Sequence, residues 1–565
     1  MWLLCKINMA KCNISKLVTS FNVLVAFLFL FGGCKKNDQT SSLSTDTSLS
    51  FTINGTNNGS LKYTNLTGKP VIKFTFTEAI NTATVNNGIL LKDQTGTTVT
   101  ITPAYEDGNK IINISPQNNL ASFTTYTLSV NEQLKSASGG RLINPVNITL
   151  MSGIDETDKF PRISDEELLT LVQKQTFKYF WDFGHPASGM ARERNTSGNT
   201  VTSGGSGFGV MAIVTGIHRN FISRADGLAR TQQIVDFLKT ADRFHGAYSH
   251  WINGNTGKAI AFSAKDNGGD LVETSLLMAG LLTARQYFNG TSTAENNLRN
   301  DITTLYNQVE WSWYRNGTNS LIWHWSPGFN WDINLKIQGW NECLITYILA
   351  ASSPTYTIPK LVYDEGWAKN GAIRNGNTYY GVQLPLGSAN GGPLFLSHYS
   401  FLGINPNGLT DAYANYETQN KAHAMINYNY CVANPAKHNG YSADCWGLTA
   451  SDIPGGYTAS SPNNDRGVIA PTAALASFPY TPTQSMAALK FFYYKLGDKI
   501  WKEYGFVDAF NLNDPWFASS HLAIDQGPII IMIENHRSQL LWNLLMSAPE
   551  IKTGMAKLGF SSPNL

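Results

Sequence analysis

Between residues 50 and 152, apolar and polar residues alternate in short runs separated by Asn-Gly, Thr-Gly and Gly-Gly pairs. A period of two places every second side chain on the same face of a β-strand, and pairs containing glycine are typical of turns between strands. The clearest runs contain Ile72, Phe74 and Phe76; Ile112 and Ile114; and Tyr126, Leu128 and Val130. This pattern predicts an all-β sandwich of about 100 residues.

The periodicity becomes helical after a polar segment at residues 153–162, which we interpret as a linker. Apolar residues then recur every three to four positions, and Ser164 and Glu167 have the spacing of a capping box at a helix start. Helices are expected near residues 206–220, 226–243, 270–289, 294–312, 339–352, 411–431, 483–497 and 526–546. Many helices without strand alternation predict an all-α domain over residues 163–555, either an (α/α) barrel or a solenoid. No short helical repeat is visible, which favours the barrel.

The N-terminus has the pattern of a lipoprotein signal at residues 1–34. Lys6, Lys11 and Lys16 precede an apolar stretch at residues 17–30 that is too short for a comfortable membrane span, and Cys34 follows two glycines. We therefore expect an exported protein that is lipidated at Cys34, anchored to the cell envelope and followed by a Ser/Thr/Asp-rich tether at residues 35–49. An ordinary signal peptide and a short membrane anchor are the alternatives.

The composition indicates a neutral polar ligand. Charged residues make up 15% of the 565 residues, the net charge is +2, and aromatic residues reach 12% with 14 Trp; typical soluble proteins have about 25% charged residues. The lack of a basic patch argues against nucleic acid. Carbohydrate fits, because sugar C–H faces pack on aromatic rings. No zinc-site spacing is present, so we expect no metal and no cofactor.

Three cysteines follow the signal segment. Cys343 lies in an apolar run and is expected to be a buried thiol. Cys431 and Cys445 flank a loop rich in Pro, Gly and Asn, and export would place them in an oxidising compartment. They form a candidate disulfide.

Acidic residues stand at or just before the N-termini of three nearly apolar helices. Asp266, Asp270 and Glu273 are spaced i, i+4, i+7 and would share one face if that turn is helical; Glu342 and Asp525 begin two further apolar runs. Helix capping is the alternative explanation for each of them. The inner helices of an (α/α) barrel run parallel, so their N-terminal ends would bring these acids together. Paired carboxylates are what glycoside hydrolysis requires.

Two other segments are candidates for substrate binding. The loop before Glu342 is rich in tryptophan, which favours sugar stacking over a purely structural role. Residues 204–209 are rich in glycine but lack the Lys-Ser/Thr of a phosphate-binding loop, so they are expected to let the backbone approach substrate or a neighbouring helix. The candidate substrate-binding residues are Trp323, His324, Trp325, Trp331, Trp340, Arg192, Glu193, Gly207 and Phe208. Arg192 and Glu193 could equally belong to a plain surface ion pair.

Several segments together resemble a known family, the glucoamylase-like bacterial proteins of glycoside hydrolase family 144. They cover roughly residues 163–550 in order: Phe180-Trp181-Asp182-Phe183, Gly205-Ser206-Gly207-Phe208-Gly209, Asp266-Asn267-Gly268-Gly269-Asp270-Leu271-Val272-Glu273-Thr274, Trp323-His324-Trp325-Ser326-Pro327, Gly339-Trp340-Asn341-Glu342-Cys343-Leu344, Cys445-Trp446-Gly447-Leu448-Thr449-Ala450-Ser451-Asp452 and Ser477-Phe478-Pro479-Tyr480-Thr481-Pro482. The segment Phe76-Thr77-Glu78-Ala79-Ile80-Asn81 resembles the bacterial Ig-like modules attached to surface enzymes.

This resemblance implies an (α/α)6 barrel that cleaves β-1,2-glucan or its oligosaccharides with inversion and without a cofactor. By motif match it places Asp266, Asp270, Glu273 and Glu342 in the site, with Glu342 a favoured acid; the surroundings of Asp525 are less distinctive. We expect desolvation to raise the pKa of Glu342, so that it acts as general acid, and the helix dipole to keep Asp525, the leading candidate base, ionised. The two carboxyls should be separated by roughly 6.5–9.5 Å. Asp266, Asp270 or Glu273 could be the base instead.

Two other classes remain open from the sequence. A non-catalytic glycan-binding lipoprotein would also be helical and rich in tryptophan, but it would not need converging acids. A polysaccharide lyase would need an anionic substrate and more Arg and Lys near its cleft.

Overall fold

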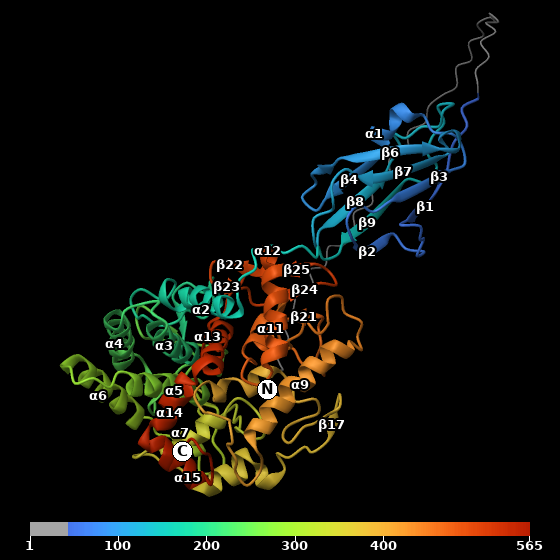
Figure 1. Ribbon diagram of the computed structural model, residues 1–565. Helices are drawn as coiled ribbons and strands as arrows, with labels where there is room; N and C mark the ends of the chain where they lie inside the picture. The colour runs from blue at the N-terminus through green and yellow to red at the C-terminus, as the bar shows by residue number, and fades with distance from the viewer. Residues whose placement is uncertain (1–42) are drawn as a thin grey trace, which may run out of the picture. The chain divides into compact units, whose positions relative to one another are not determined.

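The computed structural model describes residues 43–565, which divide into two compact units between Asp155 and Glu156 (Figure 1). The predicted signal segment and Cys34 lie outside the described residues. Within the part of the chain that is described, no helix has both the length and the apolar character needed to cross a membrane.

The N-terminal unit is a sandwich of two sheets. One sheet has the strand order β1-β3-β7-β6 and the other β2-β9-β8-β4-β5; β2 and β9 are parallel, and every other neighbouring pair is antiparallel. The strands are β1 (Leu49–Ile53), β2 (Lys62–Leu66), β3 (Ile72–Phe76), β4 (Ile89–Asp93), β5 (Thr98–Val99), β6 (Ile101–Glu106), β7 (Ile111–Pro116), β8 (Thr125–Val130) and β9 (Val146–Ser152).

The sandwich core is built from the residues whose alternation predicted it. Phe74 on β3 lies opposite Ile112 on β7, and both are fully buried, as is Leu128 on β8. Burial of every second side chain removes one face of each sheet from water, which is the main force that holds two sheets together. The predicted inward faces are therefore confirmed.

The second unit is dominated by helices. Its longer helices are α2 (Asp165–Trp181), α3 (Ser203–His218), α4 (Arg224–Thr240), α5 (Leu271–Tyr287), α6 (Thr293–Asn307), α7 (Leu344–Ser352), α9 (Tyr416–Ala433), α11 (Pro482–Lys490), α13 (Ala523–Ser538), α14 (Leu540–Ser547) and α15 (Pro549–Leu558). Between them the loops contain strands of two to four residues, which the sequence pattern did not predict. Alternation is recognisable only over about four or more residues, so such short pairs leave no signal.

Helix starts and ends follow local chemistry, with two corrections. The predicted capping box is present, because Ser164 accepts from the Glu167 N–H and Glu167 accepts from the Ser164 N–H. The helix expected at 526–546 is instead two helices, since Gln539 has a left-handed backbone (φ 59°) and ends α13. The helix expected from residue 339 begins only at Leu344, which leaves Glu342 in the turn before α7.

Helices α3, α5 and α7 are buried on nearly all sides and form the centre of the unit. Close packing of α3 on α5 requires glycine, because a Cβ on Gly207 would lie 2.3 Å from the Leu276 carbonyl oxygen. The start of α3 also meets the starts of α5 and α13, since a Cβ on Gly204 would lie 2.5 Å from Glu273 Oε2. A Cβ on Gly205 of α3 would lie 2.7 Å from the Cβ of Ala523 at the start of α13. This convergence brings the candidate acids together.

Candidate active site

Asp270 is both a helix cap and part of a polar cluster. Its Oδ1 accepts from the backbone N–H groups of Val272 (3.0 Å) and Glu273 (2.9 Å), the first residues of α5. Its Oδ2 lies 3.3 Å from His250 Nδ1 and accepts from Trp323 Nε1 at 3.3 Å. The side chain is fully buried. The capping explanation and the site explanation therefore hold together for this residue.

Glu273 connects the start of α5 to the start of α3. Its Oε2 accepts from the Gly204 N–H at 2.9 Å, and its Oε1 lies 3.9 Å from His250 Nε2. Burial raises the pKa of Glu273, while the charge of His250 opposes that rise. A Cβ at Gly204 would lie 2.5 Å from Glu273 Oε2, so glycine at this position leaves room for the carboxylate.

His250 is a site residue that sequence reasoning missed. Burial by itself would lower its pKa, but the neighbouring carboxylates of Glu273 and Asp270 raise the pKa to about 9, so the ring is a cation at neutral pH. It stacks on Phe262 with centroids 4.3 Å apart. No motif surrounds His250, and nothing in its spacing connects it with an aspartate twenty positions later.

Asp266 lies in a turn rather than on a helix. It forms an isolated bridge with Ser263, and α5 begins only at Leu271. The expected helical face shared by Asp266, Asp270 and Glu273 is therefore wrong, although Asp266 still lies close to Asp270. Burial and the charge of Asp270 raise the pKa of Asp266 to about 6.

Glu342 lies in the turn before α7 and is partly accessible to solvent. Its backbone carbonyl accepts from Ser400 Oγ, and within residues 43–565 its carboxyl has no hydrogen bond to another residue's side chain. Burial, helped by the charges of Glu273 and Asp270, raises the pKa of Glu342 to about 7. The expected rise through desolvation is confirmed, and the group retains a proton near neutral pH.

Asp525 lies in the first turn of α13 and is 3% exposed. Its carboxyl is hydrogen-bonded to that of Asp508, which lies between the short strands β23 (Gly505–Phe506) and β24 (Phe510–Asn511). Burial and the charge of Asp508 raise the pKa of Asp525 well above its ordinary value. The expectation that the helix dipole keeps Asp525 ionised is wrong, because these two effects outweigh the dipole.

Tyr399, at the start of the turn η7 (Tyr399–Leu402), connects the two groups of acids. Burial raises its pKa well above the ordinary value, and the charges of Asp525 and Glu342 add to the rise. One phenol thus lies within electrostatic reach of acids from α13 and from the turn before α7. Phe208 packs edge-on against Tyr399 with centroids 5.3 Å apart. Phe208 itself is buried, so it supports this ring and does not offer a surface to substrate.

The tryptophans of the predicted sugar-binding loop have different environments. Trp323 reaches Asp270, and His324 is buried beside it on a two-residue strand that pairs with Gly269 and Asp270. Trp325 and Trp331 remain partly accessible but pack around Trp313, with centroids 5.6 and 4.7 Å from it.

Trp340 is a correction to the predicted stacking set. It is buried and lies against the rings of Phe401 and Tyr416, with centroids 6.1 and 6.3 Å away. At 8% exposure Trp340 offers little surface for a sugar to stack on, so it belongs to the core.

The glycine-rich segment and the residues before it are also corrected in part. Gly207 serves the contact between α3 and α5 rather than substrate. Arg192 stacks over the Phe183 ring at 4.4 Å and donates to the Phe183 carbonyl, so its guanidinium has partners inside the protein. Glu193 forms an ion pair with Arg194 at 3.0 Å.

The candidate disulfide is not formed. Cys343, Cys431 and Cys445 are all free and buried. Burial raises the pKa of the Cys431 thiol to about 12 and that of Cys445 well above its ordinary value. Thiolates are the species that react to form disulfides, so these thiols are held in the unreactive protonated form.

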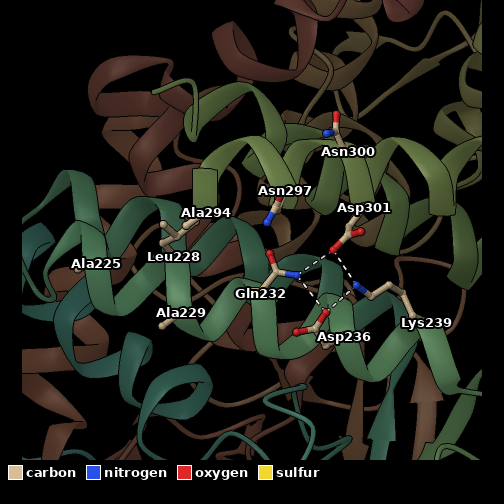
Figure 2. A pocket seen from close by; sticks show the side chains of 10 residues that line it. All are labelled: Ala225, Leu228, Ala229, Gln232, Asp236, Lys239, Ala294, Asn297, Asn300 and Asp301. Carbon is tan, nitrogen blue, oxygen red and sulfur yellow. Dashed lines mark hydrogen bonds and ion pairs between the residues drawn. The ribbon is translucent and has the colours of Figure 1, made fainter. Parts of the chain in front are cut away.

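A surface groove of about 710 Å³ lies elsewhere, between α4 and α6 (Figure 2). Its polar side chains are bonded to one another: Gln232 donates to both Asp236 and Asp301, and Lys239 contacts the same two carboxylates. None of the acids around Tyr399 lines it. Within residues 43–565, no three or more His, Cys, Asp or Glu side chains are arranged to hold a metal ion.

Comparisons with known proteins match both units. A family model described as "Putative glucoamylase" matches residues 334–549, and a model of a bacterial Ig-like domain matches residues 38–150. An exo β-1,2-glucooligosaccharide sophorohydrolase (non-reducing end) from Parabacteroides distasonis is 49% identical over 419 residues, which cover 70% of this chain. The match spans only 58% of that relative's length.

Two solved structures are also similar. An endo-β-1,2-glucanase from Chitinophaga pinensis, in complex with sophorotriose and glucose, is 53% identical with a TM-score of 0.71, over 72% of this chain and 100% of that one. A β-1,2-glucanase from Parabacteroides distasonis is 40% identical with a TM-score of 0.69, over 86% of this chain and 71% of that one. The chain therefore belongs to the glucoamylase-like bacterial proteins of glycoside hydrolase family 144 and carries an Ig-like domain in front of its helical unit.

Proposed function

We propose that this protein hydrolyses β-1,2-linked glucan or its oligosaccharides. The observation that carries the proposal is the convergence of acids from α5, the turn before α7 and α13. Over 72% of its length the chain is 53% identical to an endo-β-1,2-glucanase. A carbohydrate with no charge of its own also suits a site whose groups are carboxyls, a phenol and indoles.

In the proposed mechanism, Glu342 is the general acid. A carboxyl with a pKa of about 7 holds its proton near neutral pH and can donate it to the glycosidic oxygen as the bond to the anomeric carbon breaks. A water molecule attacks that carbon from the opposite face and gives its proton to Asp525. Asp266, Asp270 and Glu273 shape the site, and the product has inverted configuration.

We further propose that the helical unit is an (α/α)6 barrel with α3, α5, α7 and α13 in its inner ring. These helices are buried on nearly all faces, whereas α6 and α15 have one apolar and one polar face, as outer helices should. An experimental structure in which these four helices do not alternate with outer helices would contradict this arrangement.

The proposed location is the cell envelope, through a lipid on Cys34. The support is the basic and apolar pattern before Cys34 and the polar tether after it. Metabolic labelling with a fatty-acid analogue should mark the wild-type protein and leave Cys34→Ala unmarked. Equal labelling of the two would contradict the anchor.

The activity is tested by incubating the protein with β-1,2-, β-1,3-, β-1,4- and α-1,4-glucans and identifying the products. We expect cleavage of the β-1,2-glucan, and NMR of freshly formed product should detect the inverted anomer. Cleavage of starch-type α-glucan alone would refute the substrate, and binding without release of reducing sugar would favour a glycan-binding protein instead.

A further inference from the structure

Four polar side chains from separate segments meet beside α13. Asp525 comes from α13 and Asp508 from the loop before β24. Asp452 lies on the short strand β19 (Ala450–Ile453), and Arg194 lies in the loop between α2 and α3. Asp508 and Asp525 are almost fully buried, at 1% and 3% exposure.

Direct contacts connect these side chains in a row. Arg194 Nη1 lies 3.3 Å from Asp452 Oδ1. The Asp452 backbone N–H donates to Asp508 Oδ2 at 2.6 Å, and the carboxyl of Asp508 is hydrogen-bonded to that of Asp525. Ser520 Oγ donates to the other Asp452 oxygen at 2.5 Å. Asp508 is therefore fixed on one side by the backbone of a strand that an ion pair holds in place.

The hydrogen bond between the two carboxyls requires a proton. An ionised carboxylate can only accept, so one member of the pair must be protonated to donate. Asp508 Oδ1 and Asp525 Oδ2 are buried, and within residues 43–565 no N–H group or hydroxyl donates to either of them. Two buried carboxyls in contact do not both ionise, because in a low-dielectric environment the first negative charge strongly repels the second.

We propose that Asp508 and Asp525 form a dyad that shares one proton and whose anion receives the proton of the attacking water, with Arg194 and Asp452 as positioning residues. This inference rests on the proposed hydrolysis. It goes beyond it, because it makes Asp508 part of the base and replaces a lone ionised Asp525 by a singly charged pair.

The step balances within the groups already named. The water oxygen forms a bond to the anomeric carbon, the bond from that carbon to the glycosidic oxygen breaks, and the leaving oxygen takes the proton of Glu342. The water proton passes to the anion of the dyad, which is then fully protonated. Loss of that proton to solvent and protonation of Glu342 restore the starting state.

Every charged or titratable group that faces the dyad enters its pH dependence. These groups are Asp452, Arg194, Tyr457 and Tyr399. Burial is the largest effect and raises the pKa of Asp508 to about 7; Asp452 adds to the rise and Arg194 opposes it. A base is inactive when protonated, so the acidic limb of the pH profile reports ionisation of the pair.

The first experiment compares kcat/KM against pH for the wild-type chain and Asp508→Asn. The amide removes the like charge and can donate to Asp525, so the pKa of Asp525 falls. We expect the acidic limb to move to lower pH by about one unit or more. An acidic limb at the wild-type position would overturn the dyad. Asp465→Asn is the matched control, because Asp465 is a partly buried acid in a separate cluster with Tyr430, Tyr441 and His438.

A second measurement does not depend on activity. A group whose folded pKa is raised stabilises the protein below its unfolded pKa and loses that contribution as the pH rises through the folded value. The relevant window is about 3 pH units wide, from pH 5 to pH 8, around the raised pKa values of the two carboxyls. Across this window the melting temperature of the wild-type protein should fall more than that of Asp508→Asn. Parallel curves would refute the shared proton. A chain that shows the difference but cleaves no β-1,2-glucan would refute the proposed function and leave the dyad standing.

Discussion

The acids near Tyr399 fall into two groups, and the negative charge of each group is compensated in a different way. On the α5 side, Asp270 and Glu273 accept from backbone N–H groups at helix starts and lie beside His250, a cation at neutral pH. On the α13 side, Asp508 and Asp525 are bonded to each other, and Arg194 contacts Asp452 rather than either of them. One group is balanced by a cation, and the other by a retained proton.

The difference shows that position at a helix N-terminus does not by itself set the charge of a carboxyl. The dipole contributes about 0.3–1 kcal/mol at an exposed site, whereas burial and a like charge shift pKa values by up to about 3–5 units. Asp270 caps α5 and Asp525 lies in the first turn of α13, so both stand at the start of a buried helix. Their neighbours, a carboxyl in one case and a histidine in the other, give them different environments.

The largest expected effect comes from removing the proton donor and the proton acceptor one at a time. Glu342→Gln and Asp525→Asn should each lose at least about a hundredfold in kcat while remaining folded. With an aryl glycoside whose leaving group needs no protonation, the Glu342→Gln defect should shrink and the Asp525→Asn defect should persist. Kinetics on natural and aryl substrates measure this, and the reverse pattern would exchange the two roles.

The next effect concerns the cation on the α5 side. His250→Gln leaves Asp270 and Glu273 without a counter-charge in a buried site, so we expect a loss of about 3 kcal/mol in the free energy of unfolding at neutral pH. The pKa of His250 is raised, so its contribution is fully present below about pH 6.5. That contribution is lost as the pH rises through about 9.

This pH dependence is checked by thermal unfolding between pH 6 and pH 10, a range of about 4 units that includes the unfolded and the folded pKa of His250. The wild-type protein should lose its advantage over His250→Gln toward the alkaline end. A constant difference between the two proteins would mean that His250 contributes through packing alone.

The smallest expected effect tests whether the placement of the Glu273 carboxylate matters for stability and turnover. Gly204→Ala brings a Cβ to 2.5 Å from Glu273 Oε2, so the carboxylate must shift. The cost should be about 1–3 kcal/mol of stability with a modest loss of kcat. Gly456→Ala is the control, because the nearest atom to a Cβ there is 3.9 Å away. Equal behaviour of the two variants in unfolding and turnover assays would remove Glu273 from the architecture of the site.

Much of the fold and part of the site could be predicted because they rest on local patterns. Alternation at Phe74 and Ile112 gave the sandwich faces, and Ser164 with Glu167 gave a helix start. Acids at the starts of buried helices pointed to the right helices. The helix at 526–546 was predicted too long, because the left-handed turn at Gln539 carries no glycine to signal it.

The sequence by itself determined the two units, the inward faces of the strands, the buried helices and the acids at their starts, since each follows from residues within a few positions of one another. Only the tertiary structure decided that His250 lies beside Asp270, that Asp508 bonds to Asp525 and that Trp340 is covered by Phe401. These features depend on side chains from distant segments. Burial and neighbouring charge set the protonation state of a carboxyl, and neither quantity exists until the chain has folded.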